Sequence, residues 1–411
     1  MRYRFIEGVL LKMTASRIKS IVVMVFIMIM LIAATARADL SNITAESYIL
    51  MDAASGQIIQ AQNEHKRLPP ASMTKLMTLT LAVEALDKGK VRPNDRVISS
   101  VKASQIEGTQ IHLKKSEEMS YEHMLIAMAL SSANDASIAV AEHLEGSEKN
   151  FVAKMNQKAR DLGLKDSQFK NATGLPAEGH YSSAYDMAVI ARYALTHTRI
   201  TEYTSLKQYN LRQGSSKLSN SNKLLWWYQG ANGLKTGWTS SAKHCLTASA
   251  KRGNLQLIAV VMACPRAHGH LQDAIEMLDY GFERYTSKVL LPQGTVCGTV
   301  KVKNGEQDRV QVTAAEAVGS VVLKGQEEKL RSEAKLNSIV SAPVKKGQKL
   351  GEILVYNNQA LLKKVNLLAS QDVSAAKLSN IPPHSSSIAY VLLTLFLIIA
   401  LYLYLKCRSR I

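Results

Sequence analysis

Ser72 and Lys75 are the two residues whose types and spacing best suit nucleophilic catalysis in this sequence. They follow Pro69-Pro70 and precede a strongly apolar stretch, so we predict that a turn enters a helix here and that the two side chains, three residues apart, share one face. A serine hydroxyl becomes a good nucleophile when a nearby base takes its proton, and a desolvated lysine with a depressed pKa can be that base. Backbone N–H groups at the start of the helix would stabilise developing negative charge.

The Ser-x-x-Lys pattern carries little information by itself, because it occurs six more times in the chain. Two further motifs distinguish Ser72. The first is Ser132-Ala133-Asn134, which follows an apolar helical segment at 124–130. Its hydroxyl and amide could relay a proton and hold a substrate amide, although an isolated Ser-x-Asn is more often a turn or a helix cap.

The second motif is Lys235-Thr236-Gly237-Trp238, which contains the only Lys-Thr-Gly of the chain and lies on a predicted strand. Lys235 and Thr236 would present a charge and a hydroxyl to a carboxylate, and Gly237 would let a ligand backbone lie against the strand. The backbone N–H of Trp238 could join that of Ser72 as an oxyanion hole.

This ordered set of three motifs resembles that of penicillin-binding proteins and serine β-lactamases. The flanking sequence is similar to the low-molecular-weight D-alanyl-D-alanine carboxypeptidases over about residues 45–285, with Ala133 at a position where many relatives have Gly. The segments that carry this likeness are Ser131–Ala136, Phe169–Leu175, His180–Ala188 and Gly233–Thr239. The β-rich segment after residue 286 resembles the C-terminal domain of that family by position and pattern.

The resemblance implies a penicillin-recognising, β-lactamase-like serine hydrolase that acts on peptidoglycan stem peptides ending in D-Ala-D-Ala. Ser72 would attack the carbonyl between the two D-alanines with Lys75 as proton acceptor, and water would then cleave the acyl-enzyme. Ser132 and Asn134 would shuttle the proton and orient the peptide. The substrate-binding residues would be Lys235, Thr236, Gly237 and Trp238, with the first two holding the terminal carboxylate. β-Lactam antibiotics would be covalent inhibitors, and no cofactor or metal is expected.

Several other functions are compatible with parts of this pattern. A DD-endopeptidase or a transpeptidase would use the same site, because only the scissile position or the acceptor differs, and a non-catalytic wall-binding module would keep the fold. A class A β-lactamase is disfavoured, since no deacylating Glu-x-x-Leu-Asn lies between the second and third motifs. The chain also has no Gly-x-Ser-x-Gly elbow and no His-Glu-x-x-His cluster, which argues against a Ser-His-Asp hydrolase and a zinc peptidase.

The hydrophobic periodicity predicts an α+β fold in two domains. In residues 39–285, a β-hairpin at 47–60, several amphipathic helices and strands at 233–236, 245–250 and 255–262 indicate an antiparallel sheet with inserted helices. Residues 286–377 contain short alternating segments and predict a small all-β domain. Cys245, Cys264 and Cys297 have no metal-ligand spacing, so we expect them to be small buried hydrophobic residues.

Both ends of the chain carry targeting signals. Basic residues, an apolar run and Ala36-Arg37-Ala38 predict a signal peptide at 1–38. A linker at 378–387 precedes an uncharged run at 388–405, which is long enough for a transmembrane helix, and a basic tail at 406–411 would stay cytoplasmic. We therefore expect a single-pass protein of the cell membrane with its catalytic domain on the wall side. These basic ends contribute to the net charge of +18, and no nucleic-acid-binding motif accompanies it.

Overall fold

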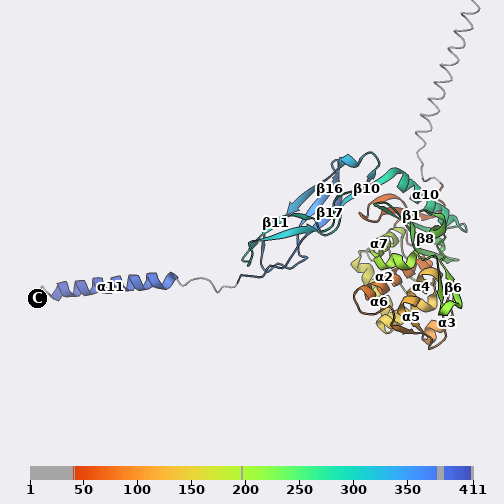
Figure 1. Ribbon diagram of the computed structural model, residues 1–411, viewed down its shortest axis with the longest axis horizontal. Helices are drawn as coiled ribbons and strands as arrows, with labels where there is room; N and C mark the ends of the chain where they lie inside the picture. Colours follow the sequence, from red (N-terminus) through yellow and green to blue (C-terminus); the bar gives the residue numbers. More distant parts are fainter. Residues whose placement is uncertain (1–39, 41, 196–197, 377–383, 409–411) are drawn as a thin grey trace, which may run out of the picture. The chain divides into compact units, whose positions relative to one another are not determined.

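The computed structural model describes residues 40, 42–195, 198–376 and 384–408 of the chain (Figure 1). The predicted signal peptide lies outside these residues, as do most of the predicted linker and the last three residues of the predicted tail. The chain divides into two compact units, one ending at Tyr285 and the other beginning at Thr286.

The first unit is built on an antiparallel sheet of five strands in the order β2-β1-β9-β8-β7. These strands are β1 (Ser47–Asp52), β2 (Ile58–Gln62), β7 (Ala231–Thr239), β8 (Lys243–Arg252) and β9 (Leu255–Cys264). The predicted hairpin and the three predicted strands all belong to this sheet. Because β7 is an edge strand of the sheet, its outer N–H and C=O groups can pair with an added extended peptide.

Most helices are inserted between β2 and β7, as predicted. They are η1 (Ala71–Thr74), α2 (Lys75–Asp87), α3 (Val101–Gln105), α4 (Tyr121–Ser131), α5 (Asn134–Glu145), α6 (Glu148–Asp161), α7 (Ala184–Ala194), α8 (Thr198–Thr204), η2 (Arg212–Gly214) and α9 (Leu224–Trp227). The same region contains two small hairpins, β3 (Arg96–Ile98) with β4 (Glu118–Ser120), and β5 (Gln208–Leu211) with β6 (Ser216–Ser219). Helix α10 (Gly269–Arg284) follows β9.

The alternation of side chains along β9 explains how the layers pack. Ile258, Val260 and Met262 point into the large core that also contains the buried face of α2 and α7. Leu257, on the opposite face of the strand, lies against Gly281 of α10. Helix α2 is buried along almost its whole length, so apolar contacts fix the turn at its N-terminus, which carries Ser72.

Residues 286–376 of the second unit form strands apart from one short helix, as the sequence predicts. A six-stranded sheet has the order β14-β16-β17-β12-β11-β15, and β10 pairs with β13. The strands are β10 (Tyr285–Leu291), β11 (Val296–Lys303), β12 (Arg309–Ala314), β13 (Val318–Leu323), β14 (Leu330–Leu336), β15 (Ile339–Ser341), β16 (Lys349–Asn357) and β17 (Ala360–Ala369), with a short helix η3 (Glu327–Lys329). Its core is rich in Val and Leu.

The cysteines and the predicted anchor differ in part from the expectations drawn from the sequence. Cys245 and Cys264 are buried, but Cys297 is only half-buried, so the expectation of full burial was wrong for this residue. Helix α11 (His384–Arg408) covers the predicted anchor. Among the helices that the structure describes, none is long and apolar enough to cross a membrane. The transmembrane anchor stays a prediction.

Candidate active site

Ser72 and Lys75 meet where η1 passes into α2. The Nζ atom of Lys75 lies 3.0 Å from the Ser72 Oγ atom, in a hydrogen bond. Ser72 is partly exposed, whereas Lys75 is completely buried. The predicted turn into a helix therefore places a reachable hydroxyl next to an amine that water does not reach.

The surroundings of Lys75 favour its neutral form. Burial lowers the pKa of the Lys75 ammonium group far below its ordinary value, and the nearby charge of Lys235 lowers it further, while Asp135 acts in the opposite direction. The Lys75 Nζ atom also donates a hydrogen bond of 2.7 Å to the backbone carbonyl of Thr173. A lysine whose neutral form is favoured and which is held against a serine hydroxyl can act as a general base.

Thr173 is a positioning residue that the sequence analysis did not single out. Its loop is shaped by Asn171, whose Oδ1 accepts hydrogen bonds from the backbone N–H groups of Thr173 and Gly174. Gly174 has a φ of +83°, and a Cβ atom there would lie 1.9 Å from the carbonyl oxygen of Ala71. The spacing Asn-x-x-Gly in Phe169–Leu175 was the sequence signal for this loop. Asn171 and Gly174 allow the loop to pack closely against the turn that carries Ser72.

The second motif lies at the junction of α4 and α5. Ser132 ends α4 with a left-handed φ of 59°, and its buried Oγ atom has no hydrogen-bond partner within the described part of the chain. Asn134 begins α5, and its Nδ2 atom donates to the carbonyl of Glu107 at 2.6 Å. The Asp135 carboxylate accepts hydrogen bonds from the backbone N–H groups of Ile111 and Leu113. These bonds hold the segment 107–113 against the motif.

The third motif occupies the edge strand β7. Lys235 is buried, and burial lowers its pKa to about 7. The Thr236 hydroxyl lies 2.7 Å from the hydroxyl of Ser221, in a hydrogen bond. Like Thr173, Ser221 was not predicted from the sequence to contact the site. A Cβ atom at Gly237 would lie 2.9 Å from the carbonyl oxygen of Pro70, so glycine allows the strand to lie against the Ser72 turn. The Trp238 side chain is 62% exposed.

The structure thus connects the three motifs around one turn. Lys75 contacts Ser72 directly, Gly237 lies against the residues just before and after Ser72, and the charges of Lys235 and Asp135 act on Lys75. Among the described residues, no group of three or more His, Cys, Asp or Glu side chains could hold a metal ion. The arrangement is that of a serine hydrolase activated by a buried lysine.

Family models match both units. The model described as D-alanyl-D-alanine carboxypeptidase matches residues 32–265, and the one described as penicillin-binding protein 5, C-terminal domain, matches residues 285–375. The chain belongs to the D-alanyl-D-alanine carboxypeptidase family, the low-molecular-weight penicillin-binding proteins. Its enzymatic activity is that of a serine-type carboxypeptidase.

Individual relatives agree with this assignment. D-alanyl-D-alanine carboxypeptidase DacF of Bacillus subtilis is 42% identical over 336 residues, which are 81% of this chain and 86% of that protein. DacD of Escherichia coli is 33% identical, over 77% of this chain and 83% of its own length. The structure of penicillin binding protein 5 from Haemophilus influenzae is similar with a TM-score of 0.69 and 31% identity, covering 81% of this chain and 98% of that one.

The packing of Gly174 leads to a prediction. Gly174→Ala places a methyl group where the Ala71 carbonyl lies and strains a left-handed backbone position. The loop must therefore move away from the turn, which breaks the hydrogen bond between Lys75 and the Thr173 carbonyl. We expect acylation by a fluorescent penicillin to slow at least about tenfold. Gly163→Ala is the control, since it also has a left-handed φ but has open space around its Cβ position. Equal acylation rates for the two variants would contradict the positioning role of the loop.

Proposed function

We propose that this enzyme removes the terminal D-alanine from peptidoglycan stem peptides through an acyl-enzyme on Ser72. The observation that carries the proposal is the 3.0 Å contact between the Ser72 hydroxyl and the buried amine of Lys75. Burial lowers the pKa of this amine far below its ordinary value and favours the neutral form, whose lone pair can accept the serine proton as the Oγ atom attacks the carbonyl carbon between the two D-alanines.

The remaining groups complete acylation. The backbone N–H groups of Ser72 and Trp238 stabilise the oxyanion. Ser132 passes the proton from Lys75 to the nitrogen of the leaving D-alanine, and the unpartnered Ser132 Oγ atom is available for this relay. The C–N bond breaks, D-alanine leaves as the free amino acid, and the peptide remains as an ester of Ser72. Water then attacks the ester while Lys75 takes one of its protons. Lys75 returns this proton to the Ser72 Oγ atom as the ester bond breaks and the shortened peptide leaves.

The substrate lies along the edge strand β7 in this proposal. Lys235, when protonated, and the Thr236 hydroxyl hold the carboxylate of the terminal D-alanine. Gly237 leaves room for the substrate backbone, and Asn134, whose amide is fixed by the Glu107 carbonyl, orients the peptide. The strand geometry supports this arrangement, because an extended peptide can pair with an exposed sheet edge.

The same acyl-enzyme could also transfer the peptide to an amine, which is the reaction of a transpeptidase. An endopeptidase would form this acyl-enzyme from a cross-linked peptide, with the amine of the neighbouring stem as the leaving group, and then hydrolyse it. A similar structure with 27% identity and a TM-score of 0.55 is a DD-transpeptidase of Streptomyces. Penicillin-binding protein D2 of Listeria monocytogenes, 28% identical, has been solved in an ampicillin-bound form. We propose that β-lactams acylate Ser72 in this chain as well, because they present a reactive amide to the same nucleophile.

The role of Ser72 is tested with a peptide that ends in D-Ala-D-Ala. Ser72→Ala removes the nucleophile, so we expect the release of D-alanine to fall at least about 1,000-fold and covalent labelling by penicillin to disappear. Far-UV circular dichroism and thermal unfolding serve as controls for folding. Labelling that persists in the variant would place the nucleophile on another residue.

The burial of Lys235 predicts a pH dependence. Only the protonated form attracts a carboxylate, and its pKa is about 7 in the free enzyme, so kcat/KM for D-alanine release should fall as the pH rises above this value. Lys235→Arg keeps the positive charge at all accessible pH values and should abolish this alkaline limb, even where its absolute activity is lower. An alkaline limb that is identical in the wild type and in Lys235→Arg would remove Lys235 from carboxylate binding.

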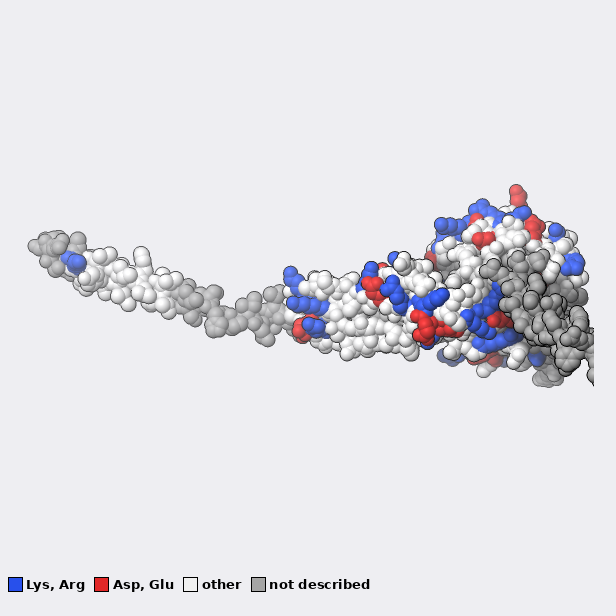
Figure 2. Space-filling view, turned by 90° about the horizontal axis from the view of Figure 1, so that it is seen from above, with Lys and Arg blue, Asp and Glu red and all other residues white. Residues whose placement is uncertain are grey.

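We also propose that the C-terminus anchors the enzyme in the cell membrane, with the catalytic unit on the wall side. An uncharged run at 388–405, followed by Lys406 and Arg408, supports this proposal. Large apolar side chains of α11 are exposed, and the helix surface is free of charge up to its basic end (Figure 2).

Extraction of membranes with alkaline carbonate tests the anchor. The full chain should stay in the membrane pellet, whereas a chain that ends at Ala376 should be soluble and still bind penicillin. Leu395→Lys combined with Ile398→Lys should also weaken retention, since charges inside a spanning segment are costly. Release of the full chain into the supernatant would contradict the anchor.

A further inference from the structure

One face of helix α6 holds the loop that carries Thr173, and this contact has no role in the mechanism above. Asn156 of α6 forms two hydrogen bonds of 2.9 Å with the backbone of Phe169, one to its carbonyl and one from its N–H. At the N-terminal end of the helix, the Oε1 atom of Glu148 accepts the backbone N–H of Ala172 at 2.9 Å. Glu148 and Asn156 are eight residues apart, so they share one face of α6 and hold the loop at two points.

The Glu148 carboxylate has a second partner. Its Oε2 atom lies 2.6 Å from the Nζ atom of Lys102 on α3, and the exposed fractions of the two side chains are 9% for Glu148 and 56% for Lys102. Because Lys102 reaches water, solvent screens this ion pair. Ala172 is buried, so water does not readily replace the Glu148 oxygen as the partner of its N–H group. The bond to Ala172 is therefore the contact that is costly to lose.

Ala172 is held at both of its backbone polar groups. Its N–H bonds to Glu148, and its carbonyl accepts a hydrogen bond of 2.8 Å from the hydroxyl of Thr78 on α2. The next carbonyl of the chain is that of Thr173, which accepts the hydrogen bond from Lys75. A residue has only two soft backbone torsions, so fixing both groups of Ala172 restricts the direction of the following carbonyl. The backbone thus connects the position of Glu148 with that of Lys75.

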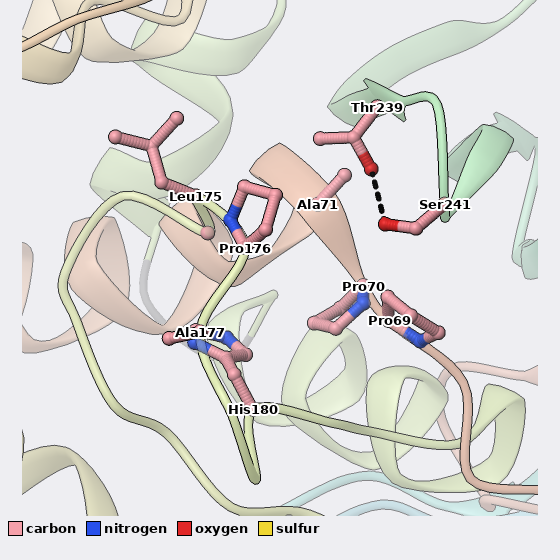
Figure 3. Close-up of a pocket in the computed structure, with 10 residues that line it drawn as sticks. Pro69, Pro70, Ala71, Leu175, Pro176, Ala177, His180, Thr239 and Ser241 are labelled. Atoms are coloured by element: carbon pink, nitrogen blue, oxygen red, sulfur yellow. Dashed lines mark hydrogen bonds between the residues drawn. The ribbon is translucent and has the colours of Figure 1, made fainter.

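Glu148 does not belong to the cavity beside the turn that carries Ser72. Further along the loop, Leu175 and Pro176 lie beside Ala71, the residue before Ser72, and these three line the cavity that Figure 3 shows. Glu148 is not part of its lining. A substitution of Glu148 therefore affects a ligand in this cavity only through the loop.

We propose that Glu148 is a positioning residue for the catalytic base. Its carboxylate fixes the backbone N–H of Ala172, which aims the Thr173 carbonyl at Lys75. The Lys75 amine, bonded to this carbonyl, is held 3.0 Å from the Ser72 hydroxyl. This inference rests on the proposed function, in which Lys75 takes the proton of Ser72.

Two other contributions of Glu148 depend on its negative charge alone. The carboxylate pairs with Lys102, and it lies in the first turn of α6, where a negative charge is favourable. A hydrogen bond from the Ala172 N–H needs an acceptor oxygen at the right distance, and the amide of glutamine supplies one without a charge. Aspartate keeps the charge but is one methylene shorter, so its oxygen does not reach Ala172 from the same backbone position. Variants at this position therefore distinguish geometry from charge.

The test measures acylation by a fluorescent penicillin, with the rate constant at saturation and the half-saturating concentration determined separately. Glu148→Ala should lower the rate constant about 10- to 100-fold, because a small displacement of the base has a large effect on proton transfer. Glu148→Asp should also be slowed at least about tenfold, whereas Glu148→Gln should stay within about threefold of the wild type. The half-saturating concentration should change less than about twofold in all three, since Glu148 does not line the cavity.

Two control variants separate positioning from stability. Lys102→Met removes the ion pair and keeps the Glu148 bond to Ala172, so its acylation rate constant should match that of the wild type. Asp273 of α10 is the matched carboxylate, because it also accepts a buried backbone N–H, that of Ala45 at 2.9 Å. Asp273→Ala should lower the Tm, as Glu148→Ala does, and leave the acylation rate constant unchanged.

The outcomes separate this inference from the proposed function. Acylation of Glu148→Ala at the wild-type rate, or equal slowing of Asp273→Ala, would overturn the positioning role alone. Acylation of Glu148→Gln that is no faster than that of Glu148→Asp would also overturn it, because the charge would then be the property that matters. This comparison decides the question even where Glu148→Ala does not fold. If the wild-type enzyme is not acylated at Ser72, the proposed function fails, and this inference fails with it.

Discussion

The burial of one amine, Lys75, is the constraint on which the rest of the catalytic unit depends. Burial removes an ammonium group from water and costs it much of its hydration energy, so the fold favours the neutral amine. The amine still needs partners, and it bonds to the Ser72 hydroxyl and the Thr173 carbonyl. The same burial that would destabilise a charged lysine therefore creates the base that activates the serine.

Close backbone packing holds these partners in place. The Gly174 loop and the β7 strand both approach the Ser72 turn, and at Gly174 and Gly237 the space for a side chain is already occupied by backbone atoms of residues 70–73. Helix α2 anchors the turn in the large core. Segments that are about 100 and 165 residues from Ser72 in the sequence thus meet at a single turn, and small movements of either would change the surroundings of Lys75.

Much of this arrangement could be predicted from the sequence, because it depends on side-chain identity and local periodicity. The order of the three motifs predicted that Ser72, Lys75 and Lys235 belong to one site, and alternating patterns predicted the sheet and the strands after residue 286. The backbone groups that contribute to the active site could not be predicted in this way. Every residue has a backbone carbonyl, so the sequence does not indicate which one will bind Lys75. Only the fold shows that it is the carbonyl of Thr173. The partial exposure of Cys297 and the cavity near Ser72 likewise depend on tertiary packing.

The catalytic role of Lys75 requires that burial lowers its pKa far below the ordinary lysine value, so that the neutral amine is available. NMR of the enzyme with ¹³C-labelled lysine measures this most directly, with the Lys75 signal assigned by its loss in Lys75→Met. We expect the Cε shift of Lys75 to change from that of an ammonium group to that of a neutral amine far below the ordinary lysine range. A Lys75 signal that stays in its ammonium form until the ordinary range near pH 10 would contradict the account.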